Sequence, residues 1–245
     1  MEESIINIYD ETNSVIKESF NSLRENIKFC SFEKEIKTIA ITSSKPREGR
    51  TTTSINFAIS LAREGYNVLF MDADLRKPID SKYLAQDNYK GITSYVNIGG
   101  YIEDVIYKTS IKNLSYLPCG NDTDNPSEVI GSTRFRQLML KLRDNFDYVI
   151  IDTPALNSVI DGNVIASMTD GTILLVECGS VNKEIAESAK IKLINSNAYI
   201  LGAILNRINK REYKKYYQYY NYIIKDKKYA KLKIQKHYKN SKSIG

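Results

Sequence analysis

Apolar residues in this chain fall into two patterns that alternate along its length. Short runs rich in Val, Ile and Leu are typical of buried parallel strands, whereas apolar residues three and four positions apart are typical of helices. Runs of the first kind lie within 38–43, 67–72, 114–118, 146–152, 171–177 and 198–206. Helical spacing covers 14–30, 51–64, 91–96, 102–106, 132–144 and 182–195. This order predicts an α/β fold with a mostly parallel sheet and helices on both faces.

The first predicted strand leads into a polar loop and then into a helix that begins at Thr51. Such a corner directs unpaired backbone N–H groups and the positive end of the helix dipole at a bound anion. The loop is similar to the phosphate-binding pattern G-x-x-x-x-G-K-[ST], with Ser44 at the first glycine and Arg50 at the lysine. An ordinary strand-turn-helix corner is the alternative. The residues expected to cradle a phosphate are Ser44, Pro46, Arg47, Glu48, Gly49, Arg50, Thr51 and Thr52.

Carboxylates follow two of the later apolar runs. Asp72 and Asp74 come at the end of the second strand, and Asp152 ends the run that begins at 146. Because ligands of open α/β sheets bind at the carboxyl ends of the strands, these side chains are expected beside the phosphate loop. Like charges repel there unless a metal or donor intervenes, so we expect Mg²⁺ at Thr51, Asp72 and Asp152.

The net charge of +6 over 245 residues is unevenly distributed. Residues 210–245 carry twelve Lys and Arg residues against two acidic ones, so the part before them is mildly acidic. This segment also holds eight tyrosines and few aliphatic residues, which predicts a disordered tail after a domain of residues 1–209. No apolar run approaches eighteen residues and the first residues are acidic, so we expect a cytoplasmic protein without a membrane span or signal peptide.

Three sequence motifs, and their order along the chain, resemble those of the bacterial tyrosine kinases that control capsule and exopolysaccharide synthesis. They are 43–52 as Walker A, 68–78 (VLFMDADLRKP) as Walker A′, and 146–154 (FDYVIIDTP) as Walker B. With weaker similarities, the resemblance extends over about residues 14–222. The weaker similarities are Asn-Pro-Ser-Glu at 125–128, Asp-Gly at 170–171, Leu-Asn-Arg at 205–207 and the tyrosine cluster.

The resemblance implies a P-loop NTPase fold and an ATP-dependent protein-tyrosine kinase that phosphorylates its own tail and regulates polysaccharide synthesis and export. Arg50, Asp72 and Asp74 would be the catalytic residues. Asn206 and Arg207 would recognise the adenine of ATP, and Mg²⁺ would be the metal cofactor. The phosphate acceptors would be Tyr213, Tyr216, Tyr217, Tyr219, Tyr220 and Tyr222.

The resemblance also implies partners. A membrane-anchored polysaccharide co-polymerase would activate the kinase and hold it at the inner face of the cell membrane, and a tyrosine phosphatase would reset the tyrosines. Further copies of the chain would assemble through an E-x-x-R-x-x-R motif, of which this chain has Glu18, Asn21 and Arg24 and so lacks the middle arginine. Nucleic acid is not an expected partner.

The phosphate loop departs from the family at two positions. Arg47 stands where a glycine is usual, and Arg50 brings a planar guanidinium that cannot act as a compact point charge between phosphate oxygens. Lys45 is one candidate to supply the missing contact. Two further functions therefore stay open. One is a catalytically weak nucleotide-binding scaffold of the same machinery, and the other is a Min/Par-like positioning ATPase whose basic tail binds DNA or anionic lipid.

Overall fold

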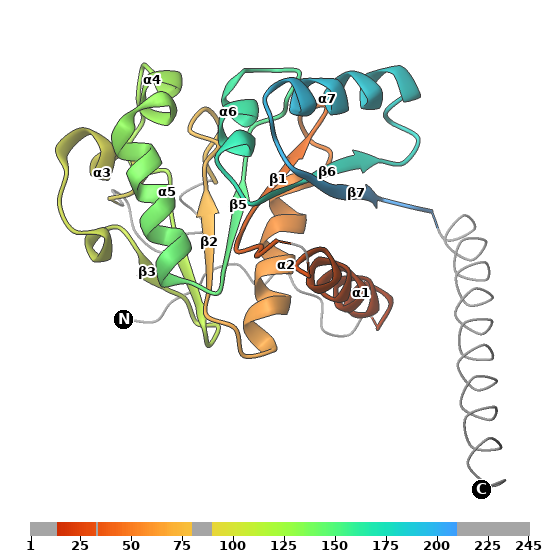
Figure 1. Cartoon of the computed structure of the whole chain (residues 1–245), viewed down its shortest axis with the longest axis horizontal. Coiled ribbons are helices and arrows are strands. Elements are labelled where there is room, and N and C mark those ends of the chain that lie inside the picture. Colours follow the sequence, from red (N-terminus) through yellow and green to blue (C-terminus); the bar gives the residue numbers. More distant parts are fainter. Residues whose placement is uncertain (1–13, 33, 80–89, 210–245) are drawn as a thin grey trace, which may run out of the picture. The chain divides into compact units, whose positions relative to one another are not determined.

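A computed structural model describes residues 14–32, 34–79 and 90–209 of the chain (Figure 1). The chain divides into two units, residues 1–206 and 207–245, and the elements named here belong to the first. The helices are α1 Ser14–Cys30, α2 Arg50–Arg63, α3 Ile92–Ile98, α4 Pro126–Gly131, α5 Thr133–Asn145, α6 Asp161–Ser167 and α7 Lys183–Asn195, with a 3₁₀ turn at Ile102–Asp104. The strands are β1 Thr38–Ser43, β2 Val68–Asp72, β3 Tyr107–Lys108, β4 Leu114–Leu117, β5 Tyr148–Asp152, β6 Gly171–Glu177 and β7 Ile200–Asn206.

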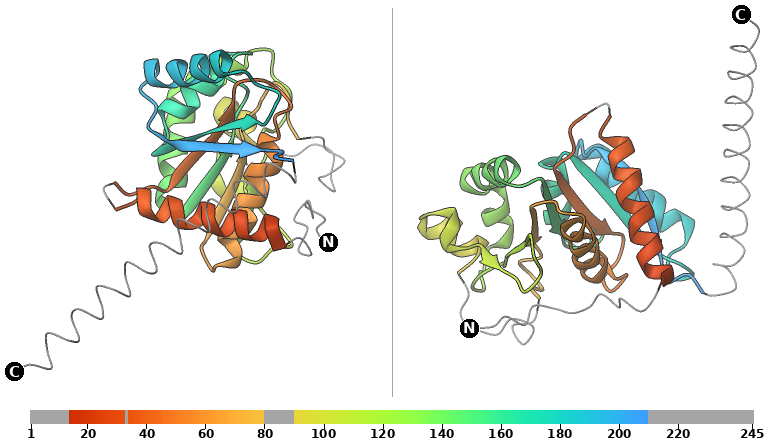
Figure 2. Two further views of the ribbon diagram at one scale, coloured as in Figure 1. Left: turned by 90° about the vertical axis from the view of Figure 1, so that its right-hand side faces the viewer. Right: turned by 90° about the horizontal axis from the view of Figure 1, so that it is seen from below.

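The described strands form one seven-stranded sheet in the order β3-β4-β2-β5-β1-β6-β7. Neighbouring strands are parallel except β3 and β4, which are antiparallel. Helices α1 and α2 pack on one face and α3 to α7 on the other, so that α1 and α7 lie on opposite sides of the sheet in Figure 2. The sheet is therefore covered on both faces, as parallel sheets usually are.

Strand β2 illustrates why the sequences of the central strands are unbroken runs of apolar residues. Each of its residues is buried, because alternate side chains enter two different cores. Val68 and Phe70 pack in the layer with α1 and α2, whereas Leu69 and Met71 pack in the layer with α3 to α6. A strand covered on both faces needs apolar residues at every position.

The structure confirms the predicted fold class and most of the predicted elements. The prediction that the last strand is buried is wrong, because β7 lies at the edge of the sheet and its residues are half-buried or exposed. Three elements, β3, α4 and α6, were not predicted. They have two, six and seven residues, which is too short to establish a period in the sequence.

Arg24 has a role inside the chain. Its buried guanidinium joins α1 to α2, donating from Nη1 to Ser60 Oγ and from Nη2 to Glu64 Oε1, each at 2.5 Å. Of the three residues compared with the assembly motif, Arg24 is thus committed to intramolecular packing. Assembly through this motif stays a prediction.

Across residues 14–32, 34–79 and 90–209, every helix is too short or too polar to span a lipid bilayer. The predicted tail at 210–245, with its tyrosines, lies outside the described residues. Its disorder and the domain boundary after residue 209 therefore stay predictions.

Asp170 organises the end of the sheet at which β1 and β6 begin. Its carboxylate accepts backbone N–H bonds from Lys37 at 3.1 Å and Thr38 at 3.0 Å, and it pairs with Arg143 Nε at 3.0 Å. Burial raises the pKa of Asp170, but the bonds from Thr38, Lys37 and Arg143 outweigh it and hold the pKa below its usual value. The ionised form is therefore the one that the fold stabilises.

We predict that Asp170→Asn lowers the free energy of unfolding by about 1–3 kcal/mol at pH 7, because an amide offers one acceptor and no charge to Arg143. The folded pKa lies below the unfolded value near ~3.9, so this stabilisation is present above about pH 4 and disappears as the pH falls through the folded pKa. Urea unfolding at pH 7, 5 and 3.5 measures the difference. Asp144→Asn, an exposed change on α5 beside Arg143, is the control, and a loss that is equal at all three pH values would contradict the prediction.

Candidate functional site

The phosphate loop connects β1 to α2 at the carboxyl end of the sheet. Helix α2 begins at Arg50, and its N-cap is Gly49 in the left-handed conformation with φ 96°. Arg47 also has a positive φ, 67°, at the place where the sequence lacks the usual glycine. Such a φ is uncommon for a residue with a side chain, so Arg47 keeps the loop conformation at an energetic cost. The backbone thus retains the shape of an anion-binding corner despite the substitution.

Glu48 holds the loop to the rest of the sheet. Its carboxylate is buried and accepts backbone N–H bonds from Lys45 at 2.5 Å and from Glu177 at 3.0 Å. Its backbone carbonyl accepts a bond from Asn206 Nδ2 at 2.8 Å. Glu48 therefore ties the loop to the last residues of β6 and β7. The sequence predicted Glu48 as a loop residue near phosphate, and its bracing role was missed.

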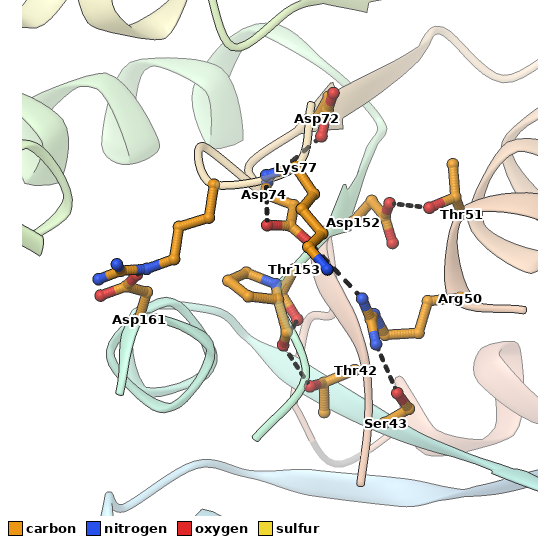
Figure 3. Close-up of polar contacts among 12 residues, drawn as sticks. Thr42, Ser43, Arg50, Thr51, Asp72, Asp74, Lys77, Asp152, Thr153 and Asp161 are labelled. Atoms are coloured by element: carbon orange, nitrogen blue, oxygen red, sulfur yellow. Dashed lines mark hydrogen bonds and ion pairs between the residues drawn. The ribbon is translucent and has the colours of Figure 1, made fainter. Parts of the chain in front are cut away.

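Arg50, at the position of the usual lysine, is engaged within the loop and across the site. Nη1 donates to Ser43 Oγ at 2.7 Å and to Lys45 O at 3.2 Å, and Nη2 lies 3.5 Å from Asp74 Oδ2 (Figure 3). One side chain thus links β1, the loop and the residues that follow β2.

Asp152 and Asp72 end adjacent strands in register. Asp152 Oδ2 accepts from Thr51 Oγ1 at 2.5 Å, and Asp152 Oδ1 accepts from Ser54 Oγ at 3.4 Å. Burial raises the pKa of Asp152 to about 6, against the bond from Thr51. Burial and then the charge of Asp152 raise the pKa of Asp72 to about 7. The charge of Arg50 opposes the rise at Asp152, but burial outweighs it.

A tight turn orients Asp72, the last residue of β2, and Asp74, which follows the strand. Asp72 accepts backbone N–H bonds from Asp74 at 3.2 Å and Ile79 at 2.8 Å, and its carboxylate points away from Arg50 in Figure 3. Asp74 accepts the N–H of Lys77 at 3.2 Å while facing Arg50. Burial raises the pKa of Asp74 and the charge of Arg50 opposes that rise. Asp74 is thus the aspartate of this pair that faces the phosphate loop.

Hydrogen bonds around the buried side chain of Asp161 anchor the same turn from the other side. Arg76 Nε donates to Asp161 Oδ2 at 2.7 Å, and its Nη2 donates to Ser127 Oγ at 2.9 Å. Ser127 in turn donates to Asp161 Oδ1 at 2.7 Å. The triangle connects the Walker A′ segment to α4 and α6. Asp161 was missed because a lone aspartate outside the predicted elements carries no signal in the sequence.

The loop has the donors that a bound phosphate requires. Within the described residues, Ser44 Oγ and Arg50 Nε are buried and have no hydrogen-bond partner. Unpaired buried donors are costly, and an anion at the start of α2 would satisfy them. The described residues contain no group of three or more His, Cys, Asp or Glu side chains that could hold a metal. Mg²⁺ does not need one, since it binds through one or two carboxylates together with phosphate oxygens and water.

The structure brings together two pairs of the predicted residues, Thr51 with Asp152 and Arg50 with Asp74. Asn206 contacts the loop backbone, and Arg207 follows it as the next residue in the chain with φ 55°. The side chains of Pro46, Arg47 and Thr52 are exposed. Individual roles for these residues stay predictions.

Residues 36–188 match the sequence family described as an AAA domain. The tyrosine-protein kinase CpsD of Streptococcus agalactiae is 37% identical over 194 residues, which are 79% of this chain and 84% of that protein.

Solved structures of other proteins share the fold. The kinase domain of the Escherichia coli tyrosine kinase ETK has a TM-score of 0.80 and 28% identity, covering 86% of this chain and 84% of that chain. The chimerical protein CapA2B2 has a TM-score of 0.77 and 32% identity, covering 85% and 94%. The septum site-determining protein MinD of Pyrococcus horikoshii, complexed with Mg-ADP, has a TM-score of 0.60 and 25% identity, covering 71% of each chain.

We predict that Gly49→Ala lowers the free energy of unfolding by about 1–2 kcal/mol. The new Cβ would lie 2.4 Å from Asn206 Nδ2 and the backbone has φ +96°, so either the loop or Asn206 must move. Urea unfolding measures the loss. Gly131→Ala is the matched control, because no atom lies within 4 Å of its Cβ position. Equal effects of the two substitutions would contradict the prediction.

Proposed function

The chain belongs to the bacterial tyrosine kinases of the capsule and exopolysaccharide type, and from this premise we propose that it phosphorylates tyrosines of its own C-terminal segment with ATP. The observation that carries the proposal is the meeting of Arg50 with Asp74 beside the pair of Thr51 and Asp152. The proposed phosphate site, the carboxylate of Asp74 and the proposed metal-binding pair would thereby share one end of the sheet.

Thr51 and Asp152 are the proposed holders of Mg²⁺, because their oxygens already lie 2.5 Å apart at the start of α2. When bound, Mg²⁺ would neutralise charge on the phosphates. Asp72 is proposed to contribute to the Mg²⁺ site from farther away, since both of its carboxylate oxygens already accept backbone N–H bonds. The backbone N–H groups from Arg47 to Thr52 would surround the phosphates, and Ser44 Oγ and Arg50 Nε would donate to them.

Asp74 is the proposed acceptor of the tyrosine proton. In the transfer, the tyrosine oxygen forms a bond to the γ-phosphorus, the bond from that phosphorus to the β–γ bridging oxygen breaks, and ADP leaves with the bond's electrons. The phenolic proton passes to Asp74. Burial raises the pKa of Asp74, which makes this carboxylate a stronger base than an exposed one.

The proposed acceptors are Tyr213, Tyr216, Tyr217, Tyr219, Tyr220 and Tyr222. Their dense spacing in a lysine-rich segment would let several tyrosines use one site in turn, presented by a neighbouring copy of the chain. Asn206 and Arg207 are proposed to contact adenine, because Asn206 lies against the loop backbone.

The physiological role we propose is regulation of capsular or exopolysaccharide synthesis and export. The partners would be a membrane-anchored co-polymerase that activates the kinase at the inner face of the membrane, further copies of the chain, and a tyrosine phosphatase. The similarity to CapA2B2, named as a chimerical protein, supports a partnership between two protein types.

A catalytically weak nucleotide-binding scaffold is the second candidate. Arg50 favours it, because its guanidinium is engaged by Ser43, Lys45 and Asp74, and a planar fork replaces a compact ammonium. Phosphate binding would then persist while transfer slows.

Intact mass after incubation with Mg·ATP and the membrane partner distinguishes the two. A kinase adds about 80 Da for each phosphorylated tyrosine, and Arg50→Lys is expected to raise the initial rate roughly tenfold, because the ammonium contacts the transferred group more closely. A variant in which all six predicted acceptor tyrosines are changed to Phe tests whether the added phosphate is on these tyrosines. Binding of Mg·ATP without added mass, with phosphate gained only by Arg50→Lys, would assign the chain to the scaffold class.

We predict that Asp152→Asn raises the metal-free stability by about 1–2 kcal/mol at pH 8, since it removes a buried charge whose pKa is raised to about 6. The hydroxyls of Thr51 and Ser54 donate to this carboxylate. They can rotate and accept hydrogen bonds from the amide that replaces it. The same change should abolish the rise in melting temperature that Mg²⁺ adds to ADP binding. Thermal unfolding with EDTA and with Mg·ADP tests both points, and a loss of metal-free stability would contradict the prediction.

A further inference from the structure

Lys77 is a charged residue of the Walker A′ segment that the mechanism above does not use. Its backbone N–H donates to the carbonyl oxygen of Asp74 at 3.0 Å and to Asp74 Oδ1 at 3.2 Å, which fixes where its side chain begins. The neighbouring Arg76 is held by Asp161 and Ser127, so the turn is fixed on that side as well.

The side chain of Lys77 extends toward the phosphate loop. In Figure 3 it runs from the turn that holds Asp74 toward Arg50, and in this view its ammonium overlaps the line that joins Asp74 to Arg50. Burial raises the pKa of Asp74, and the positive charge of Lys77 is among the effects that oppose this rise. Lys77 is exposed, so its ammonium can move to meet a ligand.

The site lacks a compact positive charge at the usual place. Arg50 occupies the lysine position of the loop, and both terminal nitrogens of its guanidinium face protein groups. Three buried aspartates lie at the same end of the sheet. A flexible ammonium that enters from the opposite side would meet a triphosphate at its outermost phosphate, because the loop itself surrounds the inner ones.

We propose that Lys77 is the phosphate-contacting residue that replaces the missing loop lysine, donating from Nζ to oxygens of the γ-phosphoryl group. The assignment rests on the proposed function for the identity of the nucleotide. Lys45 is the competing candidate. Its backbone N–H and carbonyl are used by Glu48 and Arg50, which places Lys45 within the loop rather than opposite it.

The test is calorimetric binding of two nucleotides to the full chain, Mg·ADP and the non-hydrolysable Mg·AMP-PNP. Lys77→Ala should weaken binding of Mg·AMP-PNP about tenfold or more while Mg·ADP changes less than about twofold, since only the triphosphate reaches Nζ. Lys77→Arg, which keeps the charge, should lose less. Lys190→Ala removes an exposed lysine on α7 and is the matched control for net charge.

A second arm repeats Lys77→Ala in the Arg50→Lys background. If Lys77 replaces the loop lysine, the tenfold loss should shrink to about threefold or less there, because the restored ammonium takes over the contact. Equal weakening of both nucleotides, no weakening of either, or a triphosphate-selective loss in Lys45→Ala instead would overturn the assignment. Phosphorylation is measured separately by intact mass. Selective loss in a chain that gains no phosphate would overturn the kinase proposal and support the Lys77 contact.

Discussion

Burial of three carboxylates at one end of a parallel sheet is the constraint on which this site depends. The register of β2 with β5 sets Asp72 beside Asp152, and the turn after β2 directs Asp74 to the phosphate loop. Ionised groups buried without partners cost several kcal/mol, so each carboxylate has donors around it. Even so, burial raises the pKa of all three. This end of the sheet therefore favours binding of a cation, alone or together with phosphates.

The loop that faces these carboxylates keeps its shape by means outside the usual motif. Arg47 adopts the left-handed backbone that a glycine would take without strain. Glu48 ties the loop to the ends of β6 and β7, and Gly49 leaves room for Asn206. Shape and charge are thus separable in this loop. The backbone keeps the conformation of an anion-binding corner, whereas an arginine engaged by protein groups stands at the position of the usual lysine.

The sequence predicted the fold and the outline of the site for a physical reason. Strands covered on both faces require unbroken apolar runs, and their carboxyl ends must meet at one edge, so Asp72 and Asp152 could be placed beside the loop without coordinates. The error at β7 has the same origin, because an apolar run does not reveal whether its strand lies at an edge. Short elements such as α6 gave too few residues for a period, and with α6 the partner of Arg76 was missed.

By itself, the sequence determined the alternation of strands and helices, the position of the phosphate loop and the family resemblance, since these depend on local order and spacing along the chain. Tertiary structure alone decided which groups meet. It paired Arg50 with Asp74, used the carboxylate of Glu48 as a brace, and buried Arg24 between α1 and α2. Such contacts join residues far apart in the chain, and side-chain direction across a turn follows from packing rather than from the identity of neighbours. The direction of Lys77 is of this kind, and only the folded chain revealed it.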